Sequence, residues 1–254
     1  MPIELILPDW PAPSGVRAAF TLRTGGISAP PFDALNVAAH VGDDIDAVAK
    51  NRSRLRERLQ LPSEPAWLEQ THGCRVADLD IETEPLPLAD AAVTRGGERV
   101  CVVQVADGLP VLLCAADGSV VGAAHAGWRG LAAGVLESTV SALRTPPADV
   151  LAWLGPAIGQ GRFEVGEDVH AKFTSVDPGA GVAFLQNTRG RWQCDLYALA
   201  RRRLASLGIN RIHGGQWCTC SDPGRFFSYR RDGRCGRMAA LIWMSPRASR
   251  GLCQ

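Results

Sequence analysis

The sequence lacks both a long apolar run and an excess of charge of one sign. No stretch of its 254 residues approaches the ~20 apolar residues of a transmembrane helix. Its 27 basic and 26 acidic residues nearly cancel, which provides no field for non-specific binding to nucleic acid or to a membrane. The opening MPIELILPDWPAPSG has no basic segment followed by an apolar one, as a secretory signal peptide would. These absences predict a cytoplasmic protein with neither a nucleic-acid nor a membrane partner.

Two common catalytic motifs and a clear disulfide framework are missing as well. There is no glycine-rich phosphate loop ending in Gly-Lys-Ser/Thr and no Gly-x-Ser-x-Gly nucleophile elbow. Cys218, Cys220 and Cys235 with His213 lack the Cys-x-x-Cys spacing of common zinc modules. Without a secretory signal, free thiols are expected rather than disulfides. The cysteines are Cys74, Cys101, Cys114, Cys194, Cys218, Cys220, Cys235 and Cys253.

The pattern of apolar residues predicts a single α/β (α+β) domain over residues 1–254. Because the central strands are apolar almost throughout, both faces of their sheet should be covered. Strands and helices do not alternate strictly, so mixed sheets are expected. Helices are expected at 44–59, from after Gly130 to about 143, and at 195–207. Strands are expected at 100–106, 110–115, 119–124, 150–154, 226–229 and 238–244, with Asp117-Gly118 as a hairpin turn.

Two of the five histidines lie where a ligand would have room. His125 follows the 119–124 strand in His-Ala-Gly-Trp-Arg-Gly, and His72 precedes a glycine in Trp-Leu-Glu-Gln-Thr-His-Gly. Strand-to-helix junctions place polar side chains and free backbone N–H groups at the mouth of a sheet, where ligands often bind. For each histidine alone, a structural imidazole is the more common role. The pair predicts a functional pocket if the fold brings the two rings together.

Arginines form the second group of candidates, because guanidinium groups suit phosphate or carboxylate. Arg23 lies in the turn-forming Thr-Leu-Arg-Thr-Gly-Gly segment, and Arg129 opens the helix after His125. Arg230, Arg231 and Arg237 surround a Phe-Phe-Ser-Tyr segment. For Arg231 a surface role is expected.

Taken in order, eight motifs resemble the YfiH-like family, labelled polyphenol oxidase or laccase-like and more recently purine nucleoside phosphorylase. The resemblance implies two packed mixed β-sheets flanked by helices in four layers, and zinc held by a His, Cys, His set. The most specific block is HAGWRG with the upstream ADxLPV. The motifs are TLRTGGIS (21–28), LNVAAHVGD (35–43), WLEQTHG (67–73), ADAAVT (89–94), ADGLPVLLCA (106–115), GAAHAGWRGLAAGVLE (122–137), WLGPAIGQGRFEVG (153–166) and FFSYRRDGRCGRMAALIW (226–243).

One position departs from the family pattern. His72 and His125 match the first and third zinc ligands, but Gly108 stands where the family has its ligand cysteine. A catalytic zinc normally has three protein ligands and one open position, so Gly108 predicts weak zinc binding. Cys114 is no substitute, since six extended residues at ~3.3 Å each separate the two positions by about 20 Å. Asp107 is no better, because neighbouring residues on a strand point to opposite faces.

From the resemblance we expect a zinc-dependent purine nucleoside enzyme that phosphorolyses adenosine, inosine or methylthioadenosine, or deaminates adenosine. His72 and His125 would hold the metal, Arg23 and Arg230 would clamp phosphate or ribose, and Asp107 would serve as an acid/base or support the ligands. The partners would be a nucleoside and phosphate, and the protein a monomer or weak dimer.

Three alternatives stay open. They are an amidase that edits cell-wall muropeptide precursors, a copper-dependent polyphenol oxidase, and an inactive binding protein. Copper at the histidine pair fits the second alternative. However, copper-cluster oxidases need several His-x-His pairs, and this sequence has none.

Overall fold

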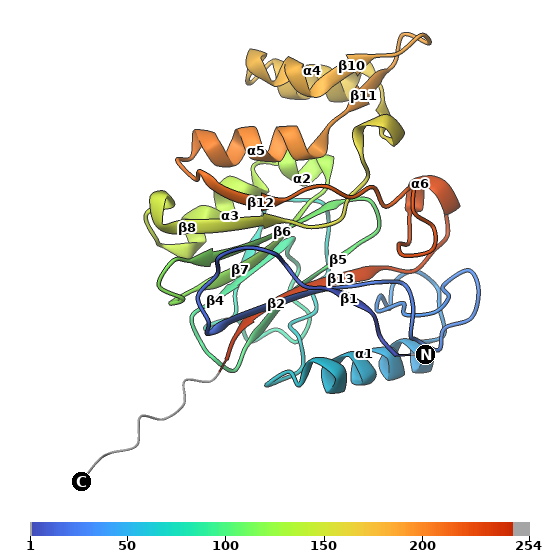
Figure 1. Cartoon of the computed structure of the whole chain (residues 1–254), viewed down its shortest axis with the longest axis vertical. Helices are drawn as coiled ribbons and strands as arrows, with labels where there is room; N and C mark the ends of the chain where they lie inside the picture. The colour runs from blue at the N-terminus through green and yellow to red at the C-terminus, as the bar shows by residue number, and fades with distance from the viewer. Residues whose placement is uncertain (1, 246–254) are drawn as a thin grey trace.

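The computed structural model of the chain describes residues 2–245, which form four stacked layers (Figure 1). A four-stranded and a six-stranded sheet lie face to face. Helix α1 (Ile45–Leu59) covers the outer face of the smaller of these two sheets. Helices α2 (Trp128–Ala133), α3 (Val135–Leu143) and α5 (Leu196–Ser206) cover the outer face of the larger one. The four-layer arrangement that the resemblance implies is therefore confirmed.

The six-stranded sheet is mixed and carries the most apolar strands. Its outer pairs β12–β8 and β4–β3 are parallel, and the pairs between them are antiparallel. The turn at Asp117-Gly118 joins β6 to β7 as predicted, and Gly118 has a φ of +72°, which glycine adopts without strain. The strand order is β12 (Arg211–Gly214), β8 (Val150–Leu154), β6 (Leu109–Ala115), β7 (Val121–Ala126), β4 (Ala91–Thr94) and β3 (Val76–Asp78).

The four-stranded sheet differs from the expectation of mixed sheets, because all its neighbours are antiparallel. Strand β13 lies between two strands that both run opposite to it. Its order is β1 (Leu5–Ile6), β2 (Val16–Thr21), β13 (Met238–Met244) and β5 (Val100–Val105). Only the six-stranded sheet is therefore mixed.

Alternation along the strands divides the apolar core. In β5, Val102 packs on the α1 side while Val103 faces the other sheet. In β6, Leu112 faces the four-stranded sheet while Leu113 packs on the side of α3 and α5. All four are fully buried, as expected for strands covered on both faces.

Helix ends follow local signals in the sequence. The side chain of Asp44 accepts a hydrogen bond from the Asp46 N–H at 2.9 Å and so caps α1. The helix predicted to run to about 143 is instead two helices, α2 and α3, separated at Gly134, whose φ is +95°. A left-handed glycine ends one helix and lets the next begin in a new direction.

The strand predicted at 226–229 is wrong. Phe226 and Phe227 are buried but belong to no strand, and Tyr229–Asp232 forms the short helix α6, capped by Ser228. An apolar aromatic run resembles a buried strand in sequence. Here the backbone turns instead, because Ser228 and the N–H of Arg230 bond to Asp107.

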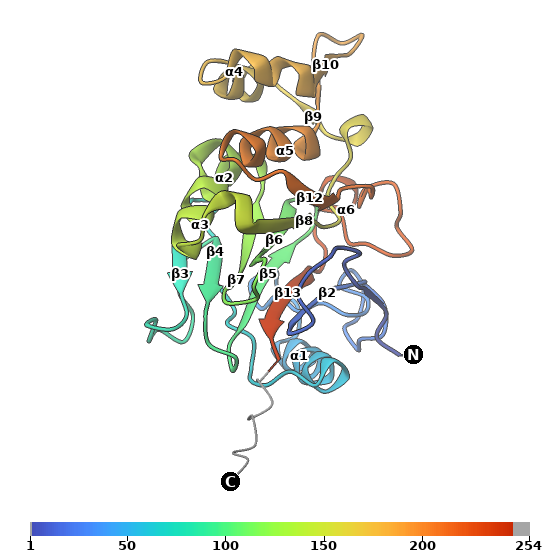
Figure 2. The same cartoon turned by 60° about the vertical axis from the view of Figure 1, so that its left-hand side comes forward.

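A small cap lies beyond α5, at the upper end of the molecule in Figure 2. It contains helix α4 (Glu167–Thr174) and a three-stranded antiparallel sheet. The order of that sheet is β10 (Phe184–Gln186), β11 (Trp192–Cys194) and β9 (Glu164–Val165). The 3-10 turns are η1 (Pro147–Asp149), η2 (Gln160–Arg162) and η3 (Pro178–Ala183). No helix within residues 2–245 is long and apolar enough to cross a membrane.

Candidate functional site

The structure brings His72 and His125 together. Their ring centroids are 4.9 Å apart, with the planes inclined by 75°. His125 lies near the end of β7, and its side chain is 6% exposed. His72 lies in the loop that precedes β3 and has a left-handed backbone, with φ of 63°. The spatial condition set by the sequence is thus met: two imidazoles far apart in the chain share one location.

A buried carboxylate, Asp90, organises both histidines. Its Oδ1 lies 3.1 Å from His125 Nδ1 and accepts the backbone N–H of His72 at 2.9 Å. Its Oδ2 accepts the N–H groups of Thr71 and Gly73 and the Thr71 hydroxyl, at 2.7–3.2 Å. Asp90 precedes β4, which pairs with β7, so the sheet places the carboxylate beside His125. The motif that contains Asp90 is visible in the sequence, but nothing there predicts a role for this residue.

The electrostatics of the pair follow from this packing. Burial alone would raise the pKa of Asp90, but hydrogen bonds from His125 and from the Gly73 and Thr71 N–H groups outweigh it and lower that pKa. Burial lowers the pKa of His72, and the cationic form of His125 lowers it further. Asp90 opposes these effects, while Arg129 and Arg237 add to them. A neutral His72 beside an ionised Asp90 is the state that these contacts favour at pH 7.

The two histidines do not form the three-ligand metal site that the resemblance implies. An ideal Cβ on Gly108 would point at His125 and lie 2.4 Å from its Nε2, so position 108 faces the site but supplies no donor. Cys114 is fully buried between the sheets. Within residues 2–245, no three His, Cys, Asp or Glu side chains are grouped to hold a metal ion. A catalytic zinc normally needs three protein donors, so the residues present do not fit that ion.

Asp107 is a structural anchor in this arrangement. Its Oδ1 accepts the Thr219 hydroxyl at 2.6 Å, and its Oδ2 accepts the Ser228 hydroxyl at 3.0 Å and the Arg230 N–H at 2.7 Å. Its carbonyl oxygen accepts the N–H of Ile158. Both carboxylate oxygens are thus committed to the loop and helix near the C-terminal strand. The acid/base role expected of Asp107 would first require these bonds to break.

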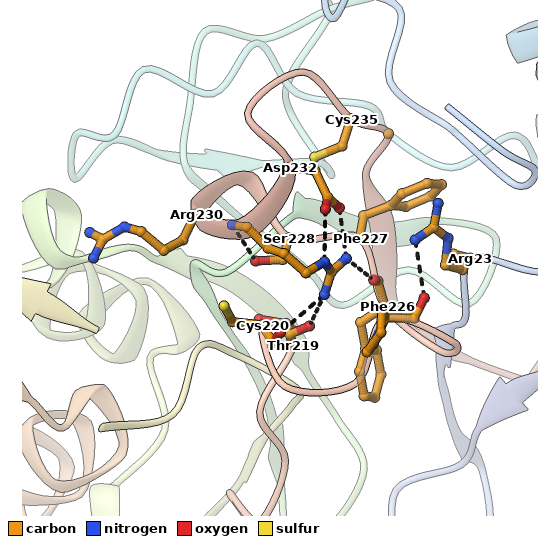
Figure 3. Close-up of polar contacts among 12 residues, drawn as sticks. Arg23, Thr219, Cys220, Phe226, Phe227, Ser228, Arg230, Asp232 and Cys235 are labelled. Carbon is orange, nitrogen blue, oxygen red and sulfur yellow. Dashed lines mark hydrogen bonds and ion pairs between the residues drawn. The ribbon is translucent and has the colours of Figure 1, made fainter. Parts of the chain in front are cut away.

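The two arginines predicted as clamps lie apart. Figure 3 shows the Arg230 side chain extending away from the loop around Ser228, on the side opposite to Arg23. Arg23 donates to the carbonyl oxygens of Asp33 and Pro223 at 3.0 and 3.1 Å, and its guanidinium lies 4.7 Å from the ring centre of Phe227. These contacts make it part of the scaffold.

Arg230 and Arg231, though adjacent, serve different sites. Arg230 lines the histidine cavity, stacks 5.2 Å from the ring centre of Phe163 and donates to the carbonyl oxygen of Glu164 at 2.8 Å. Arg231 instead donates to the carbonyl oxygens of Thr219 and Phe226, both at 2.9 Å. Rather than a plain surface arginine, Arg231 ties the loop before α6 together.

A cavity of about 550 Å³ surrounds the histidine pair. This volume lies within the ~300–1,000 Å³ typical of small-molecule sites. Among the described residues that line it, Asp107 is the one acidic side chain. Gln104 and the aromatic residues Trp128, Phe163 and Tyr229 also line it. The basic lining residues are His40, His72, His125, Arg129, Arg230 and Arg237.

Among these basic residues, Arg129 and Arg237 are candidates from the sequence, whereas His40 is a cavity residue that sequence reasoning missed. His40 and Arg237 come from loops at the two ends of the chain, and nothing in their local sequence indicates that they meet. Burial and the charge of Arg237 lower the pKa of His40. Within residues 2–245, the Arg129 guanidinium has no hydrogen-bond or ion-pair partner; it is exposed and lies 4.5 Å from the ring centre of Trp128. It is therefore available to an anion in the cavity.

The cysteines away from the cavity match the expectation of free thiols. Cys74, Cys101, Cys114, Cys194, Cys218, Cys220 and Cys235 are all free, and Cys253 lies outside the described residues. Cys218 accepts the Gly159 N–H at 3.2 Å. The second zinc arrangement considered, with His213, is not formed by the described residues.

Comparisons with known proteins agree with the fold and the motifs. The family model described as "Multi-copper polyphenol oxidoreductase laccase" matches residues 17–245. The chain is 51% identical over 241 residues to the Escherichia coli protein named purine nucleoside phosphorylase YfiH, covering 95% of this chain and 99% of that one. It is also 51% identical over 254 residues to a Xylella fastidiosa protein named purine nucleoside phosphorylase, covering 96% and 98%.

A solved structure shows the same architecture. The crystal structure of the Neisseria meningitidis protein NMB0706 superposes with a TM-score of 0.92 at 45% identity, covering 95% of this chain and 99% of that one. Sequence, motifs and architecture therefore agree over nearly the whole chain. The chain belongs to the YfiH-like family, to which the laccase description of the family model also applies.

Proposed function

We propose that this chain is a purine nucleoside phosphorylase that binds a nucleoside and inorganic phosphate in the His72–His125 cavity. Phosphorolysis breaks the bond between ribose and purine and forms a bond between ribose and phosphate. Relatives that are about half identical over almost the full chain bear this name. The observation in this structure that carries the proposal is the charge of the cavity. Its three arginines, Arg129, Arg230 and Arg237, are cationic, and Asp107 is the one carboxylate among the described lining residues. The oxygens of Asp107 already accept three hydrogen bonds.

The cavity offers separate features for the two reactants. A doubly charged phosphate suits the guanidinium groups of Arg129 and Arg237, both of which are close enough to His72 to lower its pKa. The rings of Trp128, Phe163 and Tyr229 provide apolar surface for a purine. Inosine, adenosine and methylthioadenosine share the bond to be broken, so all three are candidate substrates.

The direct test measures the products of phosphorolysis. Inosine and adenosine are incubated with the purified protein, with and without inorganic phosphate, and free purine and ribose 1-phosphate are quantified by mass spectrometry. We expect both products only when phosphate is present. Inosine formed from adenosine without phosphate would instead support the deaminase expected from the resemblance. A folded protein that releases no purine with phosphate would contradict the proposal.

A variant pair tests the anion site. Arg129→Gln removes the unpaired cation at the cavity, and loss of a charge-assisted contact worth ~1.5–3 kcal/mol should raise the KM for phosphate about 10- to 100-fold. Arg99→Gln is the matched control, because Arg99 is exposed in the loop before β5 and does not line the cavity. Equal effects of the two substitutions would remove Arg129 from the site.

A nucleoside-binding protein without turnover is the second candidate, because the resemblance implies a ligand cysteine at position 108, where this chain has glycine. Calorimetric binding of inosine without release of purine would favour it. The amidase alternative has no such specific support, and the phenol oxidase alternative has only the description of the family model. For copper, no group of three donor side chains exists among the described residues.

A further inference from the structure

The imidazole of His125 occupies the space that a side chain at position 108 would need. An ideal Cβ on Gly108 would lie 2.4 Å from His125 Nε2, closer than real Cβ contacts, and a tight 3.0 Å from Cδ2. Gly127 borders the same ring, and its ideal Cβ would lie 3.2 Å from Nε2. Two glycines therefore clear the space around one nitrogen of a buried histidine.

We infer that His125, oriented by Asp90, is a metal-free proton-transfer group in this chain, and that Gly108 provides the room for its ring. The inference rests on the proposed function, because the proton it transfers is the one that a departing purine needs. It replaces the zinc site implied by the resemblance with chemistry that the residues present can perform.

Orientation of the ring is the first argument. Asp90 lies 3.1 Å from His125 Nδ1, and an ionised carboxylate there holds the proton on Nδ1. Nε2 is then the nitrogen that exchanges protons with a ligand. The carboxylate also stabilises the positive charge that the ring acquires when Nε2 is protonated, as in other carboxylate–histidine pairs. Four N–H and O–H donors from the 71–73 segment fix Asp90 itself.

The donor set is the second argument. A metal at Nε2 would need further protein ligands on the side of Gly108. Glycine has no side chain to supply one, and a Cβ at this position would run into the His125 ring. Among residues 2–245, His72 is the imidazole in ring contact with His125, and the two rings meet edge to face with centroids 4.9 Å apart. Asp90 is already committed to five donors. Two imidazoles fall short of the three protein ligands typical of a catalytic zinc.

The proposed step balances without a metal. An oxygen of monohydrogen phosphate forms a bond to the anomeric carbon of the ribose. The bond between that carbon and the purine nitrogen breaks, and its electron pair leaves with the purine. The proton that the phosphate carries moves to His125 Nε2, and Nε2 passes it to the departing purine, so the ring returns to its neutral form with the proton on Nδ1. Protonation of the leaving group by a positioned side chain contributes about 10²–10⁴-fold in such reactions.

The test combines metal analysis with phosphorolysis of inosine. The full-length protein, purified without added metal, is analysed by mass spectrometry for zinc and copper, and turnover is measured before and after dialysis against a chelator. We expect metal well below one equivalent and turnover that survives the chelator. A tightly held equivalent of metal, or turnover lost on chelation and restored by zinc, would overturn the inference while leaving the proposed function intact.

Absence of phosphorolysis in the metal-free protein would overturn the proposed function and the proton-transfer step together. His125→Gln should lower kcat by about 10²-fold or more. Retention of kcat in this variant would overturn the role of His125. Because Asp90 positions the ring, ¹⁵N NMR of His125 should show a proton on Nδ1, and this tautomer should be lost from the spectrum in Asp90→Ala. A proton on Nε2 in the unsubstituted neutral protein would contradict the assigned orientation.

Two substitutions at position 108 distinguish the effect of an added Cβ from the effect of an added metal ligand. Gly108→Ala adds a Cβ without a donor, so it should displace His125 and lower turnover without adding metal. Gly108→Cys adds the same Cβ with a thiol, and we expect it to raise the zinc content toward one equivalent. An unchanged kcat in Gly108→Ala would overturn the claim that Gly108 leaves the space that the His125 ring needs. Thermal unfolding checks that both variants fold, and if Gly108→Ala does not, His125→Gln carries the test.

Discussion

Replacing Asp107 with asparagine should destabilise the protein, because the carboxylate joins three separate parts of the chain. Asparagine keeps an acceptor for Thr219 and tolerates the φ of 86°. Its amide group, however, would face the N–H of Arg230, which now lies 2.7 Å from Oδ2. One partly buried donor then loses its acceptor, at a cost of about 1–3 kcal/mol. Asp107→Ala leaves all three donors unpaired and should cost at least about 3 kcal/mol.

The assay is urea unfolding, with thermal melts in parallel. At about 2–4 °C per kcal/mol for a protein of this size, Asp107→Asn should lower Tm by about 2–12 °C. Asp9→Asn, at an exposed position, is the matched control and should stay within about 0.5 kcal/mol of the unsubstituted protein. If Asp107→Asn behaves like this control, the carboxylate does not anchor the loops, and an acid/base role for Asp107 becomes open again.

Three further predictions concern the scaffold. Burial would raise the pKa of Asp80, but hydrogen bonds from the Thr94 hydroxyl and backbone N–H groups lower it. The ionised carboxylate therefore stabilises the folded protein fully above the unfolded pKa of ~3.9. This stabilisation is lost as the pH falls through the lower folded pKa. Asp80→Asn should therefore cost about 1 kcal/mol at pH 7 and progressively less below pH ~4 in urea titrations, and a pH-independent difference would contradict this. Leu112→Ala should lower the free energy of unfolding by about 2–5 kcal/mol in the same assay, because Leu112 is fully buried between the sheets; a loss below about 0.5 kcal/mol would mean that the core differs from the one described. Iodoacetamide should alkylate the exposed Cys74 in the folded protein and Cys101 only after unfolding, as read out by peptide mapping, because burial raises the pKa of the Cys101 thiol. Alkylation of Cys101 in the folded protein would contradict its burial.

The elements that the sequence predicted are those with a local signal. Asp44 caps α1 where an acidic residue precedes the apolar pattern, and Asp117-Gly118 turns β6 into β7. The strand at 238–244 is apolar throughout and is central in its sheet. In each case neighbouring residues alone determine the local conformation. The Phe226-Phe227 run is also apolar but forms no strand, because the next residues, Ser228 and Arg230, bond to Asp107, over a hundred positions away in the sequence.

The residues of the candidate site also differ in whether a local sequence signal identifies them. His72 and His125 stand out by type and by flanking glycines, but only the folded chain shows that their rings meet. Asp90 carries no such mark: its role arises because β4 pairs with β7 and places a carboxylate beside the imidazole. For Arg23 the local signal was present but misleading, because a loop with two glycines is typical of a ligand site. The fold uses that guanidinium to hold Asp33 and the ring of Phe227.

The central place of β13 in the four-stranded sheet has a consequence for biosynthesis. Strands β2 and β5 precede it in the chain by more than a hundred residues, and neither pairs with the other. Until β13 leaves the ribosome, both strands present unpaired backbone and apolar faces, which are prone to aggregate. The nascent chain therefore has a long interval in which a chaperone could bind. Because Arg230 in α6 and Arg237 in the loop after it directly precede β13, the same event that completes the sheet completes the cavity.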